Sequence, residues 1–459
     1  MSGDMTRLAT LSPLDGRYRD DVAALASYFS EAALFRYRVR VEVEYLIFLS
    51  RSSRVGFVPA FDASQQAGLR ALYRQFSDAD ALAISAWDRK VNHDVKAVEY
   101  WLRERLDDLG LGAWKEAVHF ALTSEDVNNL SYGLLVRDAR DAVLLPALGQ
   151  IEARLRELAL GEAASAMLAR THGQPATPTT FGKEMNVFLA RLRRAVAAIT
   201  DVKLTGKLNG ASGTFAAHYA ALPEVDWQTF SAAFVRSLDL EPVLLTTQIE
   251  PHDTLAALCD AVKRANSILI DLSQDCWRYI SDGYLAQAPK PGEVGSSTMP
   301  HKVNPIDFEN GEGNMGIAIA LLEHISRKLP ISRLQRDLSD STVLRSLGAA
   351  FGYSLLGYQR LLRGLSKVTV RRDLLLADLE AHPEVLAEAV QTILRRVGYP
   401  EPYEALKGLS RGRAMTMDDL RRFVGELEVD DSVKAELLAL TPESYVGLAA
   451  RLATLLEGR

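Results

Sequence analysis

The sequence predicts an all-α fold, because helical periodicity dominates it, strand signals are sparse and several amphipathic stretches are unusually long. In the stretch 181–202, apolar residues recur at spacings of three and four, and Pro178 and Gly206 bracket it as start and stop signals. Similar patterns occupy 255–280, 314–329 and roughly 342–365. Helices well beyond the ordinary globular length predict a bundle or an oligomeric helical core.

The stretch 255–280 is apolar on more than one narrow stripe, so we expect other helices to surround it. A short β-branched run at 367–370 falls where the long patterns give way to shorter ones, and the segments before about residue 118 are also shorter. We therefore predict three domains: a mostly helical N-terminal domain (1–118), a central long-helix bundle with a polar loop at 289–305 (119–366), and a C-terminal helical cap (367–459).

The composition of the chain is globular, with 459 residues of which 48% are hydrophobic and 24% charged. The mild net charge of −6 argues against wholesale nucleic-acid binding. The only two cysteines, Cys259 and Cys276, indicate no disulfide framework and a reducing compartment. Residues 1–10 lack a signal-peptide pattern, and the apolar stretch 313–322 is too short to cross a bilayer. We therefore expect a cytoplasmic protein without nucleic-acid or membrane partners.

The most polar break in the helical pattern is the loop 295–305, which carries three hydroxyls, an imidazole, an ammonium group and a carboxamide. Its glycines and prolines exclude helix and strand, and a polar loop on a rigid helical scaffold is typical of a catalytic site. Chemistry alone favours His301 as the titrating group. Ser296 acts as a base only if backbone N–H groups and a cation, for which Lys302 is the candidate, stabilise its alkoxide.

Four further polar clusters interrupt the helical pattern, at 92–94, 123–126, 170–175 and 336–345. The cluster at 170–175 is expected to end a helix with a polar break. The cluster at 123–126 is also the pattern of a helix start, in which a hydroxyl caps the N–H groups ahead of acidic residues. The hydroxyls of Ser341 and Thr342 fit either a helix start or an anion site between Arg336 and Arg345.

Structural interpretations also exist for the histidines. His172 has the position of a capping or surface group, and 92–94 could form a hydrogen-bonded knot. The eight histidines are dispersed, without a metal-ligand spacing or a cysteine nearby, so we expect no zinc site. The sequence contains no phosphate-binding P-loop and no dinucleotide fingerprint.

Together with 12–18, 171–178, 248–253 and the region around 402–403, these clusters resemble the fumarase/aspartase superfamily of lyases, and within it the family that cleaves adenylosuccinate. The resemblance covers nearly the whole chain. It implies β-elimination of fumarate from adenylosuccinate, giving AMP, and from the succinyl-carboxamide ribotide earlier in purine synthesis. It also implies a homotetramer with a shared helical core, active sites built from several subunits, small nucleotide substrates, and no metal or organic cofactor.

The resemblance implies a role for each matched residue. Ser296 would be the base and His172 the acid, so the resemblance moves the base role away from His301. The succinyl carboxylates would be held by Lys302, Asn304, Thr123 and Ser124. The nucleotide and its phosphate would be held by Arg17, Tyr18, Asn92, His93, Asp94, Gln248, Arg336, Ser341, Thr342, Val343, Leu344 and Arg345. The role of the glycine-rich stretch 210–215 stays open.

Two alternatives remain. A sister lyase, such as one acting on argininosuccinate, would not need the phosphate cluster at 341–345. A helical scaffold without activity would have no reason to keep Ser296, His172, Lys302 and Asn304 together.

Overall fold

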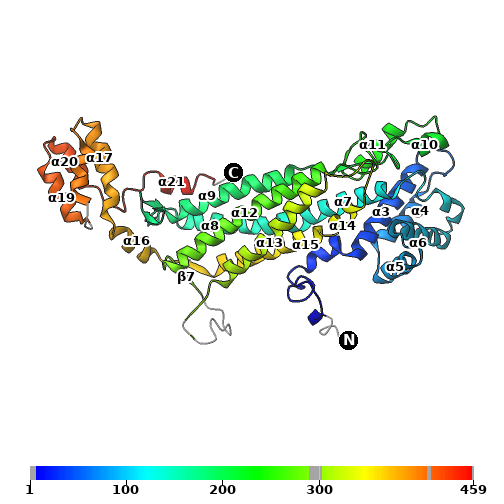
Figure 1. Cartoon of the computed structure of the whole chain (residues 1–459), viewed down its shortest axis with the longest axis horizontal. Coiled ribbons are helices and arrows are strands. Elements are labelled where there is room, and N and C mark those ends of the chain that lie inside the picture. The colour runs from blue at the N-terminus through cyan, green and yellow to red at the C-terminus, as the bar shows by residue number, and fades with distance from the viewer. Residues whose placement is uncertain (1–6, 289–298, 300–301, 411–414, 457–459) are drawn as a thin grey trace. The chain divides into compact units, whose positions relative to one another are not determined.

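The computed structural model describes residues 7–288, 299, 302–410 and 415–456. Within these ranges helices dominate, and the eight strands contain only two or three residues each. The strands pair into four separate two-stranded ladders, β1–β4, β2–β3, β5–β6 and β7–β8. The predicted all-α class is confirmed (Figure 1).

The chain divides into two compact units, each built from three separate segments of sequence. Unit 1 contains 1–148, 195–267 and 313–359, and unit 2 contains 149–194, 268–312 and 360–459. The five segment boundaries fall inside five helices, α8 (Leu145–Gly161), α9 (Phe181–Asp201), α12 (Asp253–Ser281), α13 (Ile306–Lys328) and α15 (Leu347–Lys367). The three domains expected from sequence are continuous segments, whereas each compact unit is discontinuous. The three-domain division stays a prediction.

The N-terminal part of unit 1 is a cluster of helices around one apolar core. This core includes Val39, Leu46, Trp101 and Leu102, which are almost fully buried. Capping boxes at Asp62 and Ser77 satisfy N–H groups at the starts of α4 and α5. The elements are η1 (Ala23–Leu25), α2 (Ala26–Phe29), α3 (Glu31–Ser50), α4 (Ala63–Arg74), α5 (Asp78–Val91), α6 (Asp94–Asp108), η2 (Gly112–Ala117), α7 (Ser124–Ala139) and the π-helical turn η3 (Arg140–Leu144).

The rest of unit 1 consists of parts of the long helices and a set of short elements. Asn266 on α12 donates to Ser354 Oγ at 3.0 Å and accepts from Tyr358 Oη at 2.6 Å. These two buried hydrogen bonds join α12 to α15. Lys263 of α12 pairs with Glu323 of α13. The short elements are β5 (Thr205–Gly206), α10 (Ala216–Ala221), α11 (Trp227–Ser237), β6 (Glu241–Pro242) and α14 (Ser339–Leu344).

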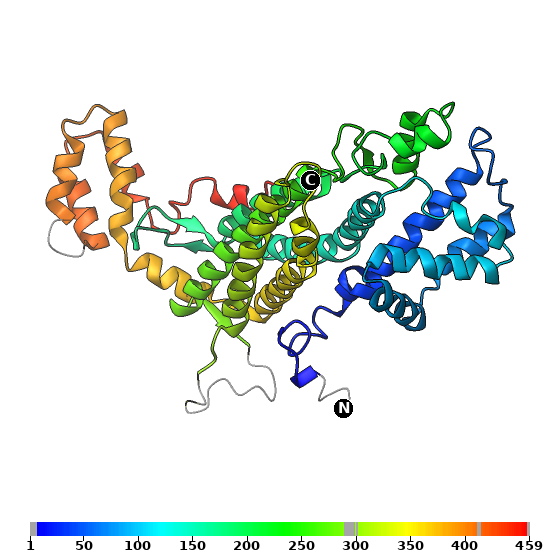
Figure 2. The ribbon, with the colours of Figure 1, turned by 45° about the vertical axis from the view of Figure 1, so that its right-hand side comes forward.

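Unit 2 contains the remaining parts of the long helices, and they pack side by side (Figures 1 and 2). Arg191 of α9 pairs with Asp271 of α12 at 2.5 Å, and Gly364 of α15 lies against Phe308 of α13. The other elements of this part are the helix α8 (Leu145–Gly161), which begins in unit 1, and the short strands β1 (Ala166–Met167), β2 (Arg170–Thr171), β3 (Gln174–Pro175), β4 (Thr179–Thr180), β7 (Leu285–Gln287) and β8 (Val368–Val370).

The C-terminal part of unit 2 has a small apolar core of its own, which includes Leu386, Val390, Leu394, Leu420 and Val424. Its elements are α16 (Arg372–Glu380), η4 (Pro383–Leu386), α17 (Ala387–Arg396), α18 (Pro402–Ser410), α19 (Met417–Glu426), α20 (Asp431–Leu438) and α21 (Ala449–Ala453).

Most predicted elements are present, with three corrections. The stretch 342–365 is not one helix, because α14 ends at Leu344 and α15 begins at Leu347. Helix α13 begins at Ile306, eight residues before the expected start at 314. The cluster 170–175 does not end a helix, because α8 has already ended at Gly161 and these residues form the β2–β3 hairpin.

Most apolar residues of the long helix α12 are buried, including Leu255, Ala256, Leu258, Ile268 and Leu272 on several sides of the helix, while Trp277 is 43% exposed. The single chain therefore buries most of the apolar surface that the sequence pattern indicated for this helix, and Trp277 is the exposed exception. In the described part of the chain, no helix combines the length and the apolar character that crossing a membrane requires.

Candidate active site

The turn between α5 and α6 positions the first predicted cluster in unit 1. Asn92 has a positive φ of 53° and closes α5 in the left-handed conformation that asparagine tolerates. His93 begins α6, because its Nδ1 accepts from the Lys96 N–H at 3.2 Å. The other ring nitrogen, Nε2, lies 3.4 Å from Ser124 Oγ. The knot expected from sequence is thus present, and it also brings two predicted substrate-binding residues together.

Asp94 joins the first predicted cluster to the segment 336–345. Its carboxylate lies 2.7 Å from the buried Arg38 guanidinium and 3.1 Å from Arg345 Nη2. Arg345 Nη1 also donates to Ser341 Oγ at 2.9 Å. Burial favours the neutral form of Asp94, but Arg38 and Arg345 outweigh it and hold the pKa of Asp94 below its usual range. The Arg345 guanidinium is therefore oriented in advance by an ionised carboxylate.

The start of α7 is a capping box formed by Thr123 and Asp126, so the structural interpretation of this cluster is confirmed. Asp126 does more than cap. Its fully buried carboxylate lies 3.1 Å from Lys207 Nζ and accepts the backbone N–H groups of Asn209 and Gly210. One carboxylate therefore ties Thr123 to the glycine-rich stretch 210–215.

Lys207 holds the next predicted residue, Gln248. Its ammonium group donates to the backbone carbonyls of Gln248 at 2.6 Å and Gly210 at 2.9 Å. The Gln248 side chain donates to the Ala211 carbonyl at 2.9 Å. Gly213 has a φ of +73°, and a Cβ there would lie 2.2 Å from the Thr246 carbonyl oxygen, so this position requires glycine.

The segment 336–345 approaches the start of α7 through Arg336, whose Nη2 lies 3.2 Å from Glu125 Oε2. Ser341 is the third residue of α14, and the helix start expected at 341–342 lies two residues earlier, at Ser339. Leu344 is 3% exposed and packs into the core, so only its backbone is available to a ligand. Thr342 is exposed and Val343 is half-buried.

The N-terminal segment that carries Arg17 and Tyr18 lies near Arg345. A cavity of about 520 Å³ in unit 1 is lined by both this segment and α15, with Asp15, Arg19, Phe29, Arg345 and Gly348 in its wall. The Arg17 guanidinium lies 5.8 Å from the centre of the Tyr18 ring. Fourteen of the eighteen predicted site residues belong to unit 1, and hydrogen bonds and ion pairs connect the clusters at 92–94, 123–126 and 336–345.

His172, the predicted acid, occupies the turn of the β2–β3 hairpin in unit 2. His172 and Gly173 have φ values of 53° and 74°, the two positive values that a two-residue type I′ turn requires. The turn is exposed, and the base of the hairpin is held by Arg170, which pairs with Asp378 at 2.7 Å. His172 therefore projects from the exposed turn of a hairpin whose base is held by an ion pair.

Lys302 and Asn304 lie directly before α13 in unit 2. Behind them, Asp307 is buried and pairs with Arg363 Nε at 2.6 Å and Lys367 Nζ at 2.9 Å, which attaches the start of α13 to α15. The Lys302 side chain is exposed. Ser296, the predicted base, and His301, the alternative, lie outside the described residues.

The sequence analysis assigned no site role to five residues that build this site. Glu125, Asp126 and His252 lie within the segments 123–126 and 248–253 that it singled out, whereas Arg38 and Lys207 lie outside them. Each of the five is a buried charged or titratable residue, and burial of such groups is costly unless they are paired. For Arg38 a signal was present, because Arg38 and Glu42 lie one helical turn apart among apolar residues of α3. For Lys207 the sequence offers no comparable signal.

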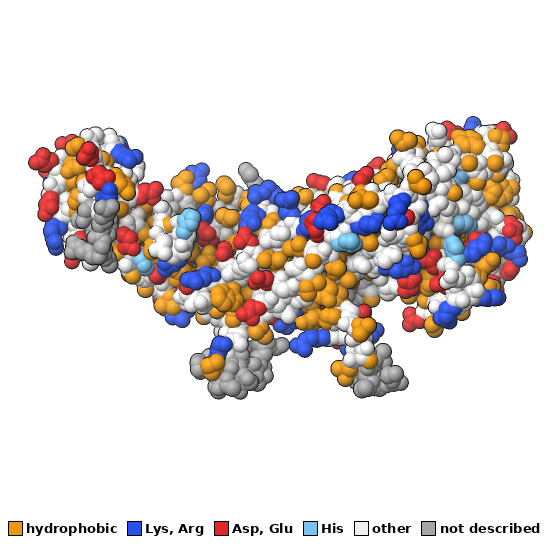
Figure 3. All heavy atoms as spheres, viewed as in Figure 1, with side chains coloured by type: hydrophobic (Ala, Val, Ile, Leu, Met, Phe, Trp, Pro, Cys, Tyr) orange, Lys and Arg blue, Asp and Glu red, His pale blue; other side chains and the backbone are white. Residues whose placement is uncertain are grey.

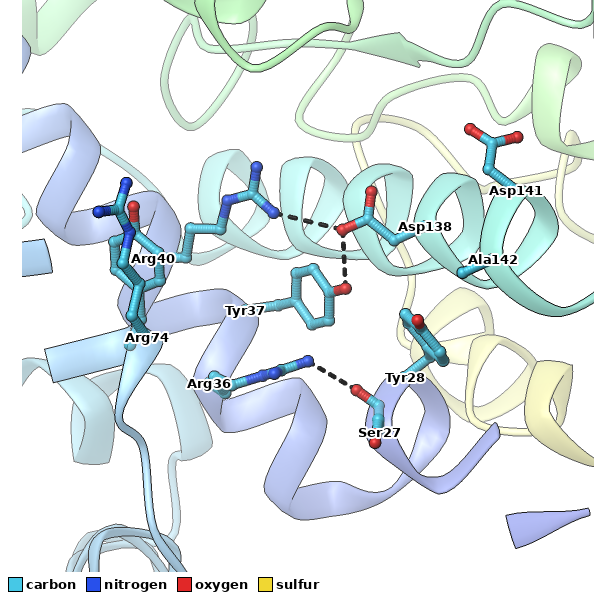
Figure 4. A pocket seen from close by; sticks show the side chains of 10 residues that line it. Ser27, Tyr28, Arg36, Tyr37, Arg40, Arg74, Asp138, Asp141 and Ala142 are labelled. Carbon is cyan, nitrogen blue, oxygen red and sulfur yellow. Dashed lines mark hydrogen bonds and ion pairs between the residues drawn. The ribbon is translucent and has the colours of Figure 1, made fainter. Parts of the chain in front are cut away.

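A second hollow in unit 1, of about 510 Å³, contains no predicted residue among the ten that line it. Figure 4 shows that several of its polar groups are joined to one another by hydrogen bonds and ion pairs. Arg36 donates to the Ser27 carbonyl at 2.7 Å, and Tyr37 Oη and Arg40 both bind Asp138, at 2.8 and 3.3 Å. Because these donors already have acceptors in the wall, we assign no substrate to this hollow.

Comparison with solved structures shows a shared fold. The chain superimposes on a fumarate lyase from Mesorhizobium sp. BNC1 with a TM-score of 0.74 at 18% identity, covering 95% of this chain and 98% of the other. It superimposes on the 3-carboxy-cis,cis-muconate lactonizing enzyme from Pseudomonas putida with a TM-score of 0.73 at 22% identity, covering 94% and 96%. At these identities the likeness shows the fold alone.

Sequence comparison identifies the family. Residues 16–319 match the model of the lyase family, and residues 332–446 match that of the adenylosuccinate lyase C-terminal domain. The adenylosuccinate lyase of Escherichia coli K12 is 49% identical over 447 residues, covering 97% of this chain and 98% of the relative. That of Dictyostelium discoideum is 48% identical over 454 residues, covering 97% of each. The chain belongs to the adenylosuccinate lyase family.

Proposed function

We propose that this protein cleaves adenylosuccinate to AMP and fumarate, and cleaves the succinyl-aminoimidazole-carboxamide ribotide to the free carboxamide ribotide and fumarate in purine nucleotide synthesis. The observation that carries the proposal is the 49% identity to the Escherichia coli adenylosuccinate lyase over nearly the full length of both chains. Both reactions break a carbon–nitrogen bond next to a carboxylate-bearing carbon. They place the same demands on a site, namely a base, an acid and groups that hold anions.

The polar cluster of unit 1 would hold the nucleotide. Arg345 and Arg336 supply guanidinium groups, which match the geometry of a phosphate, and Ser341 supplies a hydroxyl beside Arg345. His93, Asn92, Gln248, Arg17 and Tyr18 would complete this part of the site. Thr123 and Ser124, at the start of α7, would receive a succinyl carboxylate, because a helix N-terminus favours negative charge.

The catalytic groups would come from unit 2 segments. Ser296 would remove the proton from the carbon next to the carboxylate, and Lys302 and Asn304 would stabilise the negative charge that develops on that carboxylate. As the carbon–nitrogen bond breaks, its electrons would pass to the nitrogen, the carbanion pair would form the double bond of fumarate, and His172 would give its proton to the leaving amine. No metal ion or organic cofactor takes part in this scheme.

We propose a homotetramer with active sites shared between subunits. Support comes from exposure in the single chain: His172 lies at an exposed turn and Lys302 is exposed, although acid–base chemistry benefits from exclusion of water. Large apolar side chains of the long helices are also exposed, including Val187, Trp277 and Ile317 at 41%, 43% and 47%. Figure 3 shows further apolar side chains at the surface over these helices. The proposed partners are small nucleotides and other copies of the chain, in the cytoplasm.

The decisive experiment gives purified protein adenylosuccinate and follows fumarate and AMP. We expect equal amounts of both products, and no fumarate from argininosuccinate, the substrate of the nearest alternative. Turnover of argininosuccinate alone would overturn the proposal, and no turnover of either would favour a non-catalytic scaffold. Mixing inactive His172→Ala and Ser296→Ala proteins should restore part of the activity if the sites are shared. Complete failure to restore it would show that one subunit supplies both groups.

A further inference from the structure

Beneath the predicted nucleotide site of unit 1 lies a buried group of four charged or titratable side chains, Glu125, His252, Arg336 and Asp340, which we call the tetrad. Glu125, His252 and Asp340 are 1%, 3% and 2% exposed. Each offers one atom to a set in which all atoms lie within 4.8 Å of one another. Arg336 joins them through Glu125, at 3.2 Å, and Asp340, at 3.6 Å.

The polar atoms of the tetrad have few other partners. Glu125 Oε1, His252 Nε2, Arg336 Nε and Asp340 Oδ2 are all buried, and none has a hydrogen-bond partner among the described residues. Buried polar atoms are costly unless they are satisfied, so a core built for stability alone would not collect four of them. These atoms converge on one another, so we interpret the tetrad as a group that fixes the positions of its own side chains rather than as a group that stabilises the core.

Two carboxylates and an imidazole at this spacing are also a donor set that a metal ion could use. Arg336 argues against that use, because its guanidinium already lies against both carboxyl groups. A second buried cation beside it would meet strong repulsion in a medium of low dielectric constant. The cation that this cluster holds is therefore Arg336.

The three chain segments that meet in the tetrad each carry residues of the predicted substrate site. Glu125 follows Ser124, and Asp340 precedes Ser341. His252 lies four residues after Gln248, and Arg336 is itself a predicted phosphate ligand. We infer that Glu125, His252 and Asp340 are positioning residues that orient the Arg336 guanidinium toward the nucleotide. They also hold these three segments in fixed positions relative to one another. This inference rests on the proposed function.

The backbone of His252 supports a positioning role. Its φ of +63° is unusual for a residue with a side chain, and such a conformation is strained. The conformation is held locally, because the His252 N–H donates to Glu250 Oε2 at 2.9 Å and Thr205 Oγ1 donates to Glu250 Oε1 at 2.7 Å. The hydrogen bonds of Glu250 thus hold His252 in an unfavourable backbone conformation, and in this conformation the imidazole lies close to Glu125 and Asp340.

The test compares the steady-state kinetics of Glu125→Gln, Asp340→Asn and His252→Asn with those of the wild-type protein, together with AMP affinity by calorimetry. Each variant keeps the approximate shape of the side chain but removes its charge or its ring. We expect KM for adenylosuccinate and Kd for AMP to rise about 10-fold or more, because this is the usual effect of losing a hydrogen bond to a charged group. The kcat should change by less than about 3-fold. Adding Glu125→Gln to Arg336→Lys should raise KM no further, because both changes act through one guanidinium.

A matched control is His218→Asn. His218 is another fully buried histidine of unit 1 with both ring nitrogens unpartnered among the described residues, but it packs between Phe215 and Trp227. We expect this variant to lower Tm with an unchanged KM. If the tetrad variants behave in the same way, with lower Tm alone, the positioning role is wrong. If the wild-type protein neither releases fumarate nor binds AMP, the proposed function and this inference both fail. Wild-type activity together with unchanged variants overturns the inference only.

Discussion

The predicted site residues of unit 1 and those of unit 2 are held in opposite ways. In unit 1, Asp94, Asp126 and Lys207 form a buried or half-buried web of charges that fixes each segment at several points. In unit 2, His172 projects from an exposed two-residue turn, and Lys302 is an exposed side chain on a loop. Groups that bind an extended anion are most effective when they are held in place before it arrives, whereas a group that must transfer a proton has to reach the substrate. The following predictions test this contrast, from the largest expected effect to the smallest.

The largest effect is expected at the exposed turn. His172→Ala should lower kcat by about 10²–10⁴-fold, the usual contribution of a general acid, with little change in AMP affinity. Stopped assays of fumarate release and calorimetry with AMP measure the two quantities. Gln174→Ala, in the same hairpin and also exposed, is the control and should retain activity. If the His172→Ala protein were active, His172 would not be the general acid.

In the buried web of unit 1, the main effect should be on stability. Lys207→Met leaves the Asp126 carboxylate buried without its cation and should lower the free energy of unfolding by about 3–5 kcal/mol. Urea unfolding followed by circular dichroism measures this loss. Lys203→Met changes an exposed lysine four residues earlier and should cost less than about 0.5 kcal/mol. Equal losses in both variants would show that the buried Lys207–Asp126 pair contributes no more to the free energy of unfolding than an exposed lysine does.

The pH dependence of stability should reveal the buried histidine His218. Burial lowers its pKa to about 4, from about 6.5 in the unfolded chain. Above pH 6.5 neither state binds the proton, and the stability contribution is complete. As pH falls from 6.5 to 4, only the unfolded state gains the proton, so the free energy of unfolding should fall by roughly 3 kcal/mol.

His218→Phe isolates this contribution, because the variant has no group to titrate at that position. The difference in unfolding free energy between wild type and His218→Phe should change across this pH window and be constant above it. A constant difference from pH 4 to pH 8 would mean that His218 titrates normally in the folded protein.

The smallest effect is expected at the base of the hairpin. The Arg170–Asp378 pair is about a quarter exposed on each side, and such pairs contribute at most about 1 kcal/mol. Asp378→Asn should therefore lower Tm slightly and kcat by a few-fold, through the position of His172. Asp373→Asn, which alters the more exposed pair with Arg371, is the control and should change neither. A loss of kcat as large as that of His172→Ala would mean that the turn is not rigid by itself.

Much of the fold could be predicted from sequence. The stretch 181–202 is α9 almost to the residue, and Thr123 starts α7 as its capping pattern indicated. The run at 367–370 contains the strand β8, which pairs with β7. These features depend on neighbours within a few residues, so local periodicity and capping chemistry contain the necessary information.

The hairpin at 170–175 was missed for an identifiable reason. Its turn has histidine rather than asparagine or aspartate at the first position, so the usual signal for a two-residue turn is weak. Its strands are two residues long, too short for alternation to be visible. The resemblance identified His172 as a site residue, but it carried no information about the turn that presents it.

By itself, the sequence determined the helical class of this protein, its family and the set of polar segments that build a site. Only the tertiary structure decided which side chains meet. Glu125, His252 and Asp340 lie more than a hundred residues apart at their widest, and no periodicity relates them. Lys207 is an ordinary lysine in the sequence and a fully buried cation in the fold. Helices arise from contacts a turn apart, whereas buried charges are paired by the packing of distant segments, which only the complete fold specifies.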